Sequence, residues 1–447
     1  MHRRGNQRGG CLRQRELQIA VVAGLVCAML AMPSGSWAAS QFKVLYTFTG
    51  GTDGGNPYSA LIFDGSGNLY STTYSGGQAG CYGGLGCGTV FQLAPNSGGG
   101  WTENVVYAFA GQGDGGNPAS RSPLIFDAAG NLYGVTVFYG TGTGCEPYGC
   151  GTAFEITSNS GNWTQSVLYN FTYNGGDYPS GGLTFDKHGH LYGMAAGGGQ
   201  YNTGTVFELI QGMGGTWQEK LLHTFGSQDP NFGEAAGNVI FNAAGDLFAT
   251  ASLGGTHTGG VVFELMRNNR KEKTLYNFKC NFQGKCTKDG FAPEAGLIFD
   301  GQGSLYGTTN YGGRHGNGTV FKLTPSSGGT WKESILYSFK GGSDGAQPVS
   351  SLVFDPFGNL YGTTDAGGIP ATECVLGCGT VFKLTPSGGR WTESIMYAFK
   401  GASDGAQPYA PLILDSAGNL YGTAAFGGNA GCLYQYGCGV VFEISAH

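Results

Sequence analysis

Short apolar runs alternate with glycine-rich and polar segments along almost the whole chain. The clearest example is residues 351–364, S-L-V-F-D-P-F-G-N-L-Y-G-T-T, in which L-V-F and L-Y-G-T-T flank a D-x-x-G-N segment. Runs of β-branched, aromatic and aliphatic residues on both sides of a Gly-containing turn predict a β-hairpin. Such a hairpin cannot bury both of its faces alone, so we expect it to stack against copies of itself.

The hairpin pattern occurs seven times, at spacings of 55 to 63 residues. Each copy is followed by a third run, as in G-T-V-F-K-L at 318–323, and by a fourth, such as W-T-E-N-V-V-Y-A-F at 101–109. Four short strands per unit, with no helical period, predict the blade of a β-propeller. Units one to seven are anchored at Asp64, Asp127, Asp186, Asn242, Asp300, Asp355 and Asp415.

The two ends of the repeat region complement each other. The run F-K-V-L-Y-T-F at 42–48 matches a fourth strand, whereas unit seven stops after its third run at 439–444. Pairing of these segments would close a ring and leave no free sheet edge. The alternative, an open solenoid, would need capping repeats, and the sequence shows none. We predict an all-β, seven-bladed propeller of four-stranded blades, forming one domain over residues 39–447 and acting as a monomer.

These residues resemble the GloVer tandem-repeat proteins, a bacterial family built on F-D-x-x-G-N-L-Y-G-T-T followed by G-T-V-F-x-L-T-P. The resemblance extends from Phe42 to Ile444 and recurs in all seven units. It implies a secreted or surface-attached propeller and no particular activity. Many such proteins continue into a C-terminal sorting anchor. Here the chain ends three residues after Ile444, so we do not expect attachment by such a tail.

The first 38 residues have the pattern of a secretory signal peptide. Five arginines precede an apolar run at 19–32 and the small-residue site Ser36-Trp37-Ala38. An uncleaved anchor is the alternative, but 14 apolar residues are short for a membrane span. Cleavage would change the net charge from -6 to about -10, with the remaining Lys and Arg spread over different blades. We therefore expect a secreted protein, extracellular or periplasmic, with no nucleic-acid partner and no remaining membrane span.

Ten cysteines of the expected mature chain form five close pairs. Local pairing in an exported chain indicates disulfides. Metal binding by pooled thiolates is the alternative, but no His lies beside the pairs. The expected disulfides are Cys81–Cys87, Cys145–Cys150, Cys280–Cys286, Cys374–Cys378 and Cys432–Cys438.

The loops between the second and third strands differ in length around the expected ring. Units six, seven, one and two have 20 residues from the start of one strand to the start of the next, and the other units have 14. Ring closure would make the four long loops, each with a cysteine pair, one continuous arc. Aromatic side chains on stiff loops could bind a glycan or an extracellular protein, or could merely cover glycine-rich loops. The candidates are Tyr74, Tyr82, Phe138, Tyr139, Tyr148, Phe426, Tyr434 and Tyr436.

The loop that leads into each unit carries an acidic residue before Gly or Pro in most copies. Under sevenfold pseudosymmetry these carboxylates would ring the channel mouth and could attract a cation or a basic ligand. The alternative is that each Asp caps a turn, which the sevenfold repetition favours. The set is Asp53, Asp114, Asp177, Asp229, Asp289, Asp344 and Asp404. We predict no cofactor beyond such a cation.

Single-copy chemistry should break the repeat. Glu234, Glu294, Arg314 and His315 do so, and they are the candidates for an acid, a base and a charge stabiliser. Further departures include Arg121, Glu146 and Glu373. His188-Gly189-His190 is the one close pair of histidines, on a tight turn without an evident third metal ligand.

No P-loop or H-E-x-x-H motif is present in the sequence. The sequence therefore favours a non-catalytic binding or adhesion propeller. A polysaccharide lyase or hydrolase acting at the channel mouth, and a purely structural surface protein, remain the alternatives.

Overall fold

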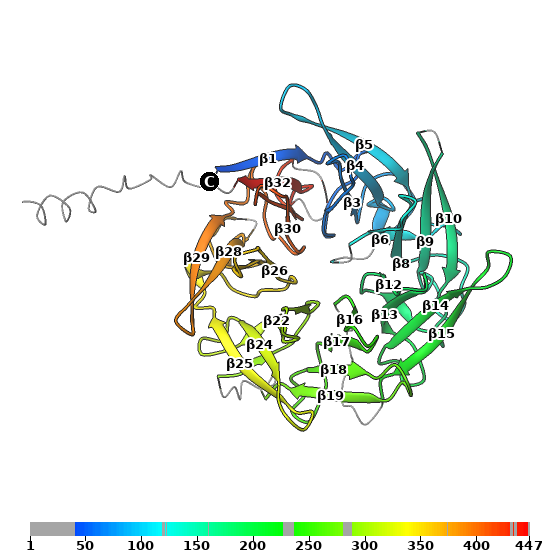
Figure 1. The fold of residues 1–447 in the computed structure, drawn as a ribbon. Coiled ribbons are helices and arrows are strands. Elements are labelled where there is room, and N and C mark those ends of the chain that lie inside the picture. Colours follow the sequence, from blue (N-terminus) through cyan, green and yellow to red (C-terminus); the bar gives the residue numbers. More distant parts are fainter. Residues whose placement is uncertain are drawn as a thin grey trace, which may run out of the picture. The chain divides into compact units, whose positions relative to one another are not determined.

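The computed structural model describes residues 41–445, apart from 119–120, 122, 160, 227–236, 280–287, 373, 430–431 and 433–435. Seven antiparallel sheets stand in a ring, with the first strand of each sheet nearest the axis and the fourth at the rim (Figure 1). This confirms the predicted seven-bladed propeller. In the described ranges, no helix is long and apolar enough to span a membrane. The predicted signal peptide, residues 1–38, lies outside them.

Each blade takes four main strands, which follow one another along the chain except in blade seven, where β1 supplies the fourth. Blade one contains β2 (Ile62–Phe63), β3 (Leu69–Thr73), β4 (Thr89–Pro95) and β5 (Trp101–Ala108). Blade two contains β7 (Ile125–Phe126), β8 (Leu132–Phe138), β9 (Thr152–Asn159) and β10 (Asn162–Asn170). Blade three contains β12 (Thr184–Phe185), β13 (Leu191–Gly197), β14 (Thr205–Gln211) and β15 (Trp217–Thr224). Blades four and five contain β16 (Ile240–Phe241), β17 (Leu247–Ala251), β18 (Val261–Leu265) and β19 (Glu272–Asn277), then β21 (Ile298–Phe299), β22 (Leu305–Thr309), β24 (Thr319–Pro325) and β25 (Trp331–Ser338). Blades six and seven contain β26 (Val353–Phe354), β27 (Leu360–Thr364), β28 (Thr380–Ser387) and β29 (Arg390–Ala398), then β30 (Ile413–Leu414), β31 (Leu420–Ala424), β32 (Val440–Ser445) and β1 (Gln41–Thr47).

Short elements lie in the loops that join the blades. Three lead-in segments form extra strand pairs: β6 (Gly116–Pro118) with β8, β11 (Asp177–Pro179) with β13, and β20 (Gly290–Phe291) with β23 (Tyr311–Gly312). There are also two 3-10 turns in the described loops, η1 (Tyr82–Gly84) and η2 (Gly342–Asp344). Because strands alternate in direction, the strand 2–3 loops and the lead-in loops share one face, here called the loop face. The D-x-x-G-N turns share the opposite, tight-turn face.

The N-terminal strand closes the ring as predicted. β1 pairs antiparallel with β32, from Gln41 against Ser445 to Thr47 against Val440. The Phe42 ring stacks on Tyr397 of blade six, with centroids 3.8 Å apart. Blades six, seven, one and two are therefore neighbours, and the four long loops lie on one arc of the loop face.

The repeated D-x-x-G-N segment is a self-capping turn. In blade six, Oδ1 of Asp355 accepts from the backbone N–H of Phe357 and Asn359, and Oδ2 accepts from the Asn359 amide and the Tyr361 hydroxyl. Burial opposes ionisation, but these hydrogen bonds hold the pKa of Asp355 below its ordinary value. In blade four, Asn242 replaces the Asp and Phe248 replaces the Tyr. The hydrogen bond from the Tyr hydroxyl to the Asp carboxylate is therefore absent from this turn, with its donor and its acceptor both replaced.

Two other repeated residues have a packing reason. The Gly of L-Y-G leaves room for the Phe of G-T-V-F, since a Cβ on Gly362 would lie 2.7 Å from Phe382. The last Thr of L-Y-G-T-T bonds the Thr of G-T-V-F across the strands, as in Thr364 and Thr380 at 2.8 Å. These residues therefore recur from blade to blade because core packing and cross-strand pairing require them.

Tryptophans at the rim fill most seams between blades on the tight-turn face. Trp391 packs 6.5 Å from the Tyr306 ring of the preceding blade, and Trp163 packs 6.2 Å from Tyr70. Trp101, Trp217 and Trp331 take the same place in their blades. Each ring seals apolar surface that two neighbouring sheets would otherwise expose.

Four of the predicted disulfides are present: Cys81–Cys87, Cys145–Cys150, Cys374–Cys378 and Cys432–Cys438. Cys280 and Cys286 lie outside the described residues. The disulfides also support the loop that leads into the next blade. A Cβ on Gly111, whose φ is +71°, would lie 2.0 Å from Cys81 Sγ, so only glycine fits against that sulfur.

The predicted acidic ring at the channel mouth is wrong for the described residues. The lead-in carboxylates lie at the rim, where they accept from a tyrosine hydroxyl of the preceding outermost strand: Asp53 from Tyr46, Asp114 from Tyr107, Asp289 from Tyr276, Asp344 from Tyr337 and Asp404 from Tyr397. Most also accept a backbone N–H of their own loop, which is the turn-capping alternative. Asp177 is buried beside Cys145, and Asp229 is not described. The cation site expected on this ring therefore has no basis.

A second carboxyl enters most of these rim seams. Burial raises the pKa of Glu103, Glu219, Glu333 and Glu393 to about 7, and for three of them the neighbouring Asp53, Asp289 or Asp344 raises it further. In blade two the same position is Gln165, whose amide donates to the Asp114 carbonyl at 3.3 Å. Neutral side chains suit this position because a second charge there is desolvated and repelled.

We expect the protein to be more stable at pH 5 than at pH 8. A carboxyl whose pKa rises from 4.5 to about 7 on folding contributes stability that is complete below 4.5 and is lost as the pH rises to 7. The expected fall in Tm is on the order of 5 °C, measured by calorimetry. Replacing the four glutamates with Gln, as at Gln165, should flatten the profile. An unchanged pH profile in that variant would contradict this account.

We also expect Phe42→Ala to lower the stability of the whole ring. The substitution removes the stacked contact with Tyr397 and weakens the β1–β32 pairing, at a cost of about 2–3 kcal/mol. Phe357→Ala is the matched control, because Phe357 is 87% exposed on a tight turn. Urea unfolding of both variants checks this. Equal midpoints for Phe42→Ala and Phe357→Ala would show that closure by β1 carries little of the stability.

Candidate binding site at the channel mouth

The channel mouth on the loop face is lined by positions that vary between blades. They are the residue after the Pro of each lead-in loop and the residue that follows the second strand. After the lead-in Pro, the described residues are Tyr58, Ser180, Glu294, Val349 and Tyr409. After the second strand, they include Tyr74, Asn310 and Asp365. At these positions the repeat fixes the backbone and leaves the side chain free to differ.

An ion pair joins blades on opposite sides of the ring. Arg121 Nη1 of the loop leading into blade two lies 2.8 Å from Glu294 Oε2 of blade five. Residues of two blades that are not adjacent can meet only near the axis. Asn310 Nδ2 donates to the other Glu294 oxygen at 3.0 Å, and the two charged side chains are 23% and 18% exposed. The pair therefore forms a partly solvated floor of the mouth.

Asp365 adds a carboxyl of unusual character beside this pair. Burial raises the pKa of Asp365 to about 7, with Arg121 opposing the shift and Glu294 adding to it. Its Oδ1 atom is buried and has no hydrogen-bond partner among the described residues. The Arg121 guanidinium also lies 5.6 Å from the ring centre of Tyr409, whose pKa burial raises. Near neutral pH the mouth thus holds a carboxyl that can still carry a proton.

Aromatic rings surround one side of this floor. Tyr58 is their centre, with ring centroids 5.5 to 5.8 Å from Tyr409, Tyr74 and Phe426. Tyr436, which is 45% exposed, extends the group outward through Phe426 at 6.0 Å. We call Tyr58, Tyr74, Tyr409, Phe426 and Tyr436 the mouth cluster. It belongs to blades one and seven, which the ring closure brings together.

A second, smaller aromatic group lies on blades two and three. Phe138 contacts Tyr178 at 5.4 Å and Tyr148, which is 41% exposed, at 6.1 Å. Tyr139 instead packs against the core between blades one and two. Blade six presents apolar side chains on its disulfide loop, where Val375 and Leu376 are 80% and 77% exposed. The arc thus carries aromatic and aliphatic side chains that its disulfide loops hold out to solvent.

The described inner loops approach one another closely beneath the mouth. A cavity of about 10 Å³ remains between Arg121, Glu294 and the inner loops of blades four to seven, and that is room for about one water. Close glycine contacts cause this, because a Cβ on Gly237 would lie 2.5 Å from the backbone of Gly296. The described part of the mouth accordingly has a shallow floor where these loops meet.

The predicted catalytic constellation is not assembled. Glu294 lies at the axis, whereas the loop of Arg314 and His315 is exposed and its Arg314 N–H donates to Ser338 on the outermost strand β25. Among the described members, Glu294 and the loop of Arg314 and His315 therefore lie in different places, which gives no support to their acting on one substrate atom. Glu234, Glu373 and Tyr434 lie outside the described residues, and so does the side chain of Tyr82.

Sequence reasoning missed Tyr58, Tyr409 and Asp365, and it named Arg121 only as a departure from the repeat. It looked for aromatics in the long loops, whereas these residues occupy repeat-equivalent positions of unchanged loop length. The available signal was variation at a fixed register: the residue after the lead-in Pro is Tyr, Glu or Val in different units. Comparing units position by position would have marked this site.

Comparison with solved structures identifies the fold. The extracellular domain assigned to a hybrid two-component system of B. thetaiotaomicron has a TM-score of 0.50 at 13% identity, covering 91% of this chain and 41% of that one. A fungal alcohol oxidase of the AA5 family, solved with copper, has a TM-score of 0.53 at 12% identity, covering 91% and 76%. Likeness at such identity concerns the fold alone.

The sequence comparisons are narrower. Among curated proteins, none matches this chain. The Gloeobacter/Verrucomicrobia repeat matches residues 137–291 and 235–447, in agreement with the resemblance to GloVer proteins seen in the sequence. Because these matches span more than half of the chain, this protein belongs to the Gloeobacter/Verrucomicrobia repeat family.

Proposed function

We propose that this protein is an exported, non-catalytic recognition module that binds a glycan at its channel mouth. The observation that carries the proposal is the mouth cluster centred on Tyr58, which stands beside the Arg121–Glu294 pair. Four disulfides fit a protein of an oxidising compartment, and the predicted signal peptide provides a route there.

Sugar recognition needs two kinds of contact, and the mouth supplies both. Aromatic faces pack against the C–H groups of a sugar ring, and Tyr58, Tyr409 and Phe426 are close enough together to hold one or two rings. Charged and amide groups bond the hydroxyls, a role that suits Arg121 and Asn310. The shallow floor favours the end or side of a chain over an engulfed small molecule.

Asp365 favours a second candidate, glycoside cleavage. A carboxyl with a pKa of about 7 can serve as a general acid, and the carboxyl of Glu294 lies near it. We rank this second because both oxygens of Glu294 are already bonded, to Arg121 and Asn310. Catalysis would require the Arg121–Glu294 pair to open for substrate.

A glycan array followed by titration of the best ligand tests the proposal. We expect Tyr58→Ala and Tyr409→Ala each to weaken binding at least about tenfold, because each removes a stacking surface. Tyr201→Ala is the matched control: Tyr201 is 46% exposed in the strand 2–3 loop of blade three, on the opposite arc of the same face. Absence of binding to any extracellular or cell-envelope polysaccharide would overturn the proposal.

The same titration separates binding from cleavage. For a recognition module, Asp365→Asn changes affinity and no reducing ends appear in any sample. If the wild-type protein releases reducing ends from the bound glycan and Asp365→Asn does not, the second candidate replaces the first.

A further inference from the structure

The seam between blades three and four lacks the tryptophan that fills the others described above. By strand register, the position two residues before Glu272 corresponds to Trp101 and Trp217, and it is Arg270. Arg270 has φ +55°, a left-handed conformation that is unfavourable for a residue with a Cβ. The repeat is thus broken here in both side chain and backbone.

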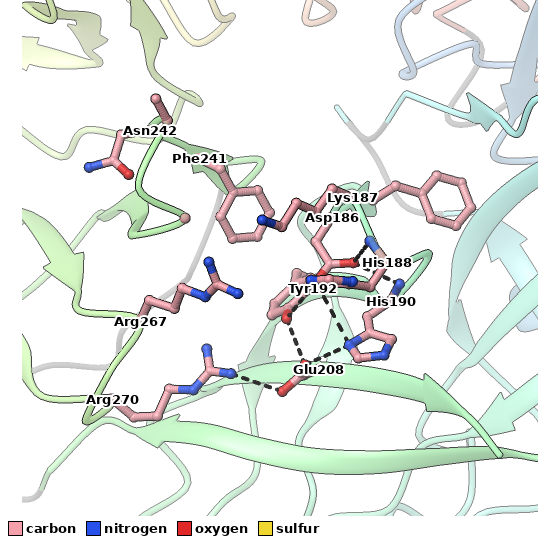
Figure 2. A pocket seen from close by; sticks show the side chains of 13 residues that line it. Asp186, Lys187, His188, His190, Tyr192, Glu208, Phe241, Asn242, Arg267 and Arg270 are labelled. Carbon is pink, nitrogen blue, oxygen red and sulfur yellow. Dashed lines mark hydrogen bonds and ion pairs between the residues drawn. The ribbon is translucent and has the colours of Figure 1, made fainter.

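A cavity of about 350 Å³ lies in this seam on the tight-turn face. The seam between blades five and six has a hollow at the equivalent place, lined there by Trp391 in place of an arginine. Phe185, Phe241 and Tyr192 form its apolar walls, with Tyr192 and Phe241 edge to face at 4.9 Å. Arg267 and Arg270 project from blade four, and Asp186, His188 and His190 belong to the facing turn of blade three (Figure 2). Its volume falls in the range of small-molecule sites, about 300–1,000 Å³.

The carboxylates around this cavity are already engaged by the protein. Glu208, 3% exposed, bonds Tyr192, His190, Lys220 and Arg270 at 2.6 to 3.3 Å. Burial opposes its ionisation, but these bonds lower the pKa of Glu208 and keep it charged. Asp186 accepts from the backbone N–H groups of His188 and His190 in its own turn. Asp246 accepts from the Asn242 amide and from the backbone N–H of Arg267.

Two cations remain for a ligand. Among the residues that line the cavity, none forms a hydrogen bond or ion pair with the side chains of Arg267 and Lys187, which reach toward it from blades four and three (Figure 2). Arg270 is fixed by Glu208 at 3.2 Å, so its remaining N–H groups are held in position beside them. A fixed guanidinium with two further cations above aromatic walls is the arrangement that binds an oxyanion carried by an organic group.

We propose that the cavity between blades three and four binds a small sugar ester of phosphate or sulfate. Arg267, Arg270 and Lys187 hold the oxyanion, and Phe185 and Phe241 flank the sugar. The ester is preferred over a bare anion because more than half of the wall is aromatic or aliphatic surface that only an organic group would cover. This site lies on the face opposite the channel mouth and does not depend on the function proposed for the mouth.

Isothermal titration of the purified protein with glucose 6-phosphate and glucose 6-sulfate tests this site. Binding of either ester, with neutral glucose at least about tenfold weaker, supports the proposal, and the preferred ester identifies the oxyanion. We expect Arg267→Gln to weaken binding about tenfold. Arg270→Trp restores the repeat residue and removes the guanidinium that Glu208 fixes, so it should weaken binding at least about tenfold.

Lys383→Gln is the matched control. Lys383 occupies the position of Glu208 in blade six, over the Tyr361 ring, and its loss removes the same charge from another seam. It should leave the affinity unchanged. The proposal is overturned if neither ester binds at millimolar concentration, if glucose binds as well as the esters, or if Arg267→Gln and Arg270→Trp bind like the wild type. An equal loss in Lys383→Gln would overturn it too, because binding would then follow net charge.

Discussion

The pairing of β1 with β32 is the contact on which the rest of the structure depends. Seven stacked units expose two sheet surfaces and one strand edge unless the last unit meets the first. The hydrogen bonds from Gln41–Ser445 to Thr47–Val440 satisfy that edge, and Phe42 seals the seam against Tyr397. Closure also fixes which blades are neighbours. The mouth cluster exists only because Tyr58 of blade one and Tyr409 and Phe426 of blade seven meet across this junction.

Repetition separates scaffold from site. Residues present in nearly every unit have a local structural partner, as Asp355 has in its own turn and Thr364 has in Thr380. Seven equal groups cannot provide one asymmetric site, since chemistry needs different side chains at neighbouring places. Both proposed sites therefore consist of exceptions to the repeat: Arg121, Asp365 and Tyr58 at the mouth, and Arg270 in the seam between blades three and four.

Burial decides what the carboxyls of this acidic chain do. The rim carboxyls, such as Asp53, bond a tyrosine hydroxyl and close a loop, although their spacing alone would also fit a ring of ligands. Glu208 is more deeply buried than Glu294, yet it serves as an anchor for Arg270. Its ion pair is stable because four donors replace the water that burial removes.

The sequence by itself determined the fold, the blade count, the closure and four of the disulfides. Each follows from local information: a hairpin written seven times, a missing strand at one end matched by a spare strand at the other, and cysteines a few residues apart. Tertiary structure alone decided where the carboxylates point and which exceptions come together. Arg121 and Glu294 are 173 residues apart, and their contact depends on the ring radius and on how closely the inner glycine loops approach. A one-dimensional repeat fixes what each unit looks like, but distances across the axis are set only when all seven blades have packed.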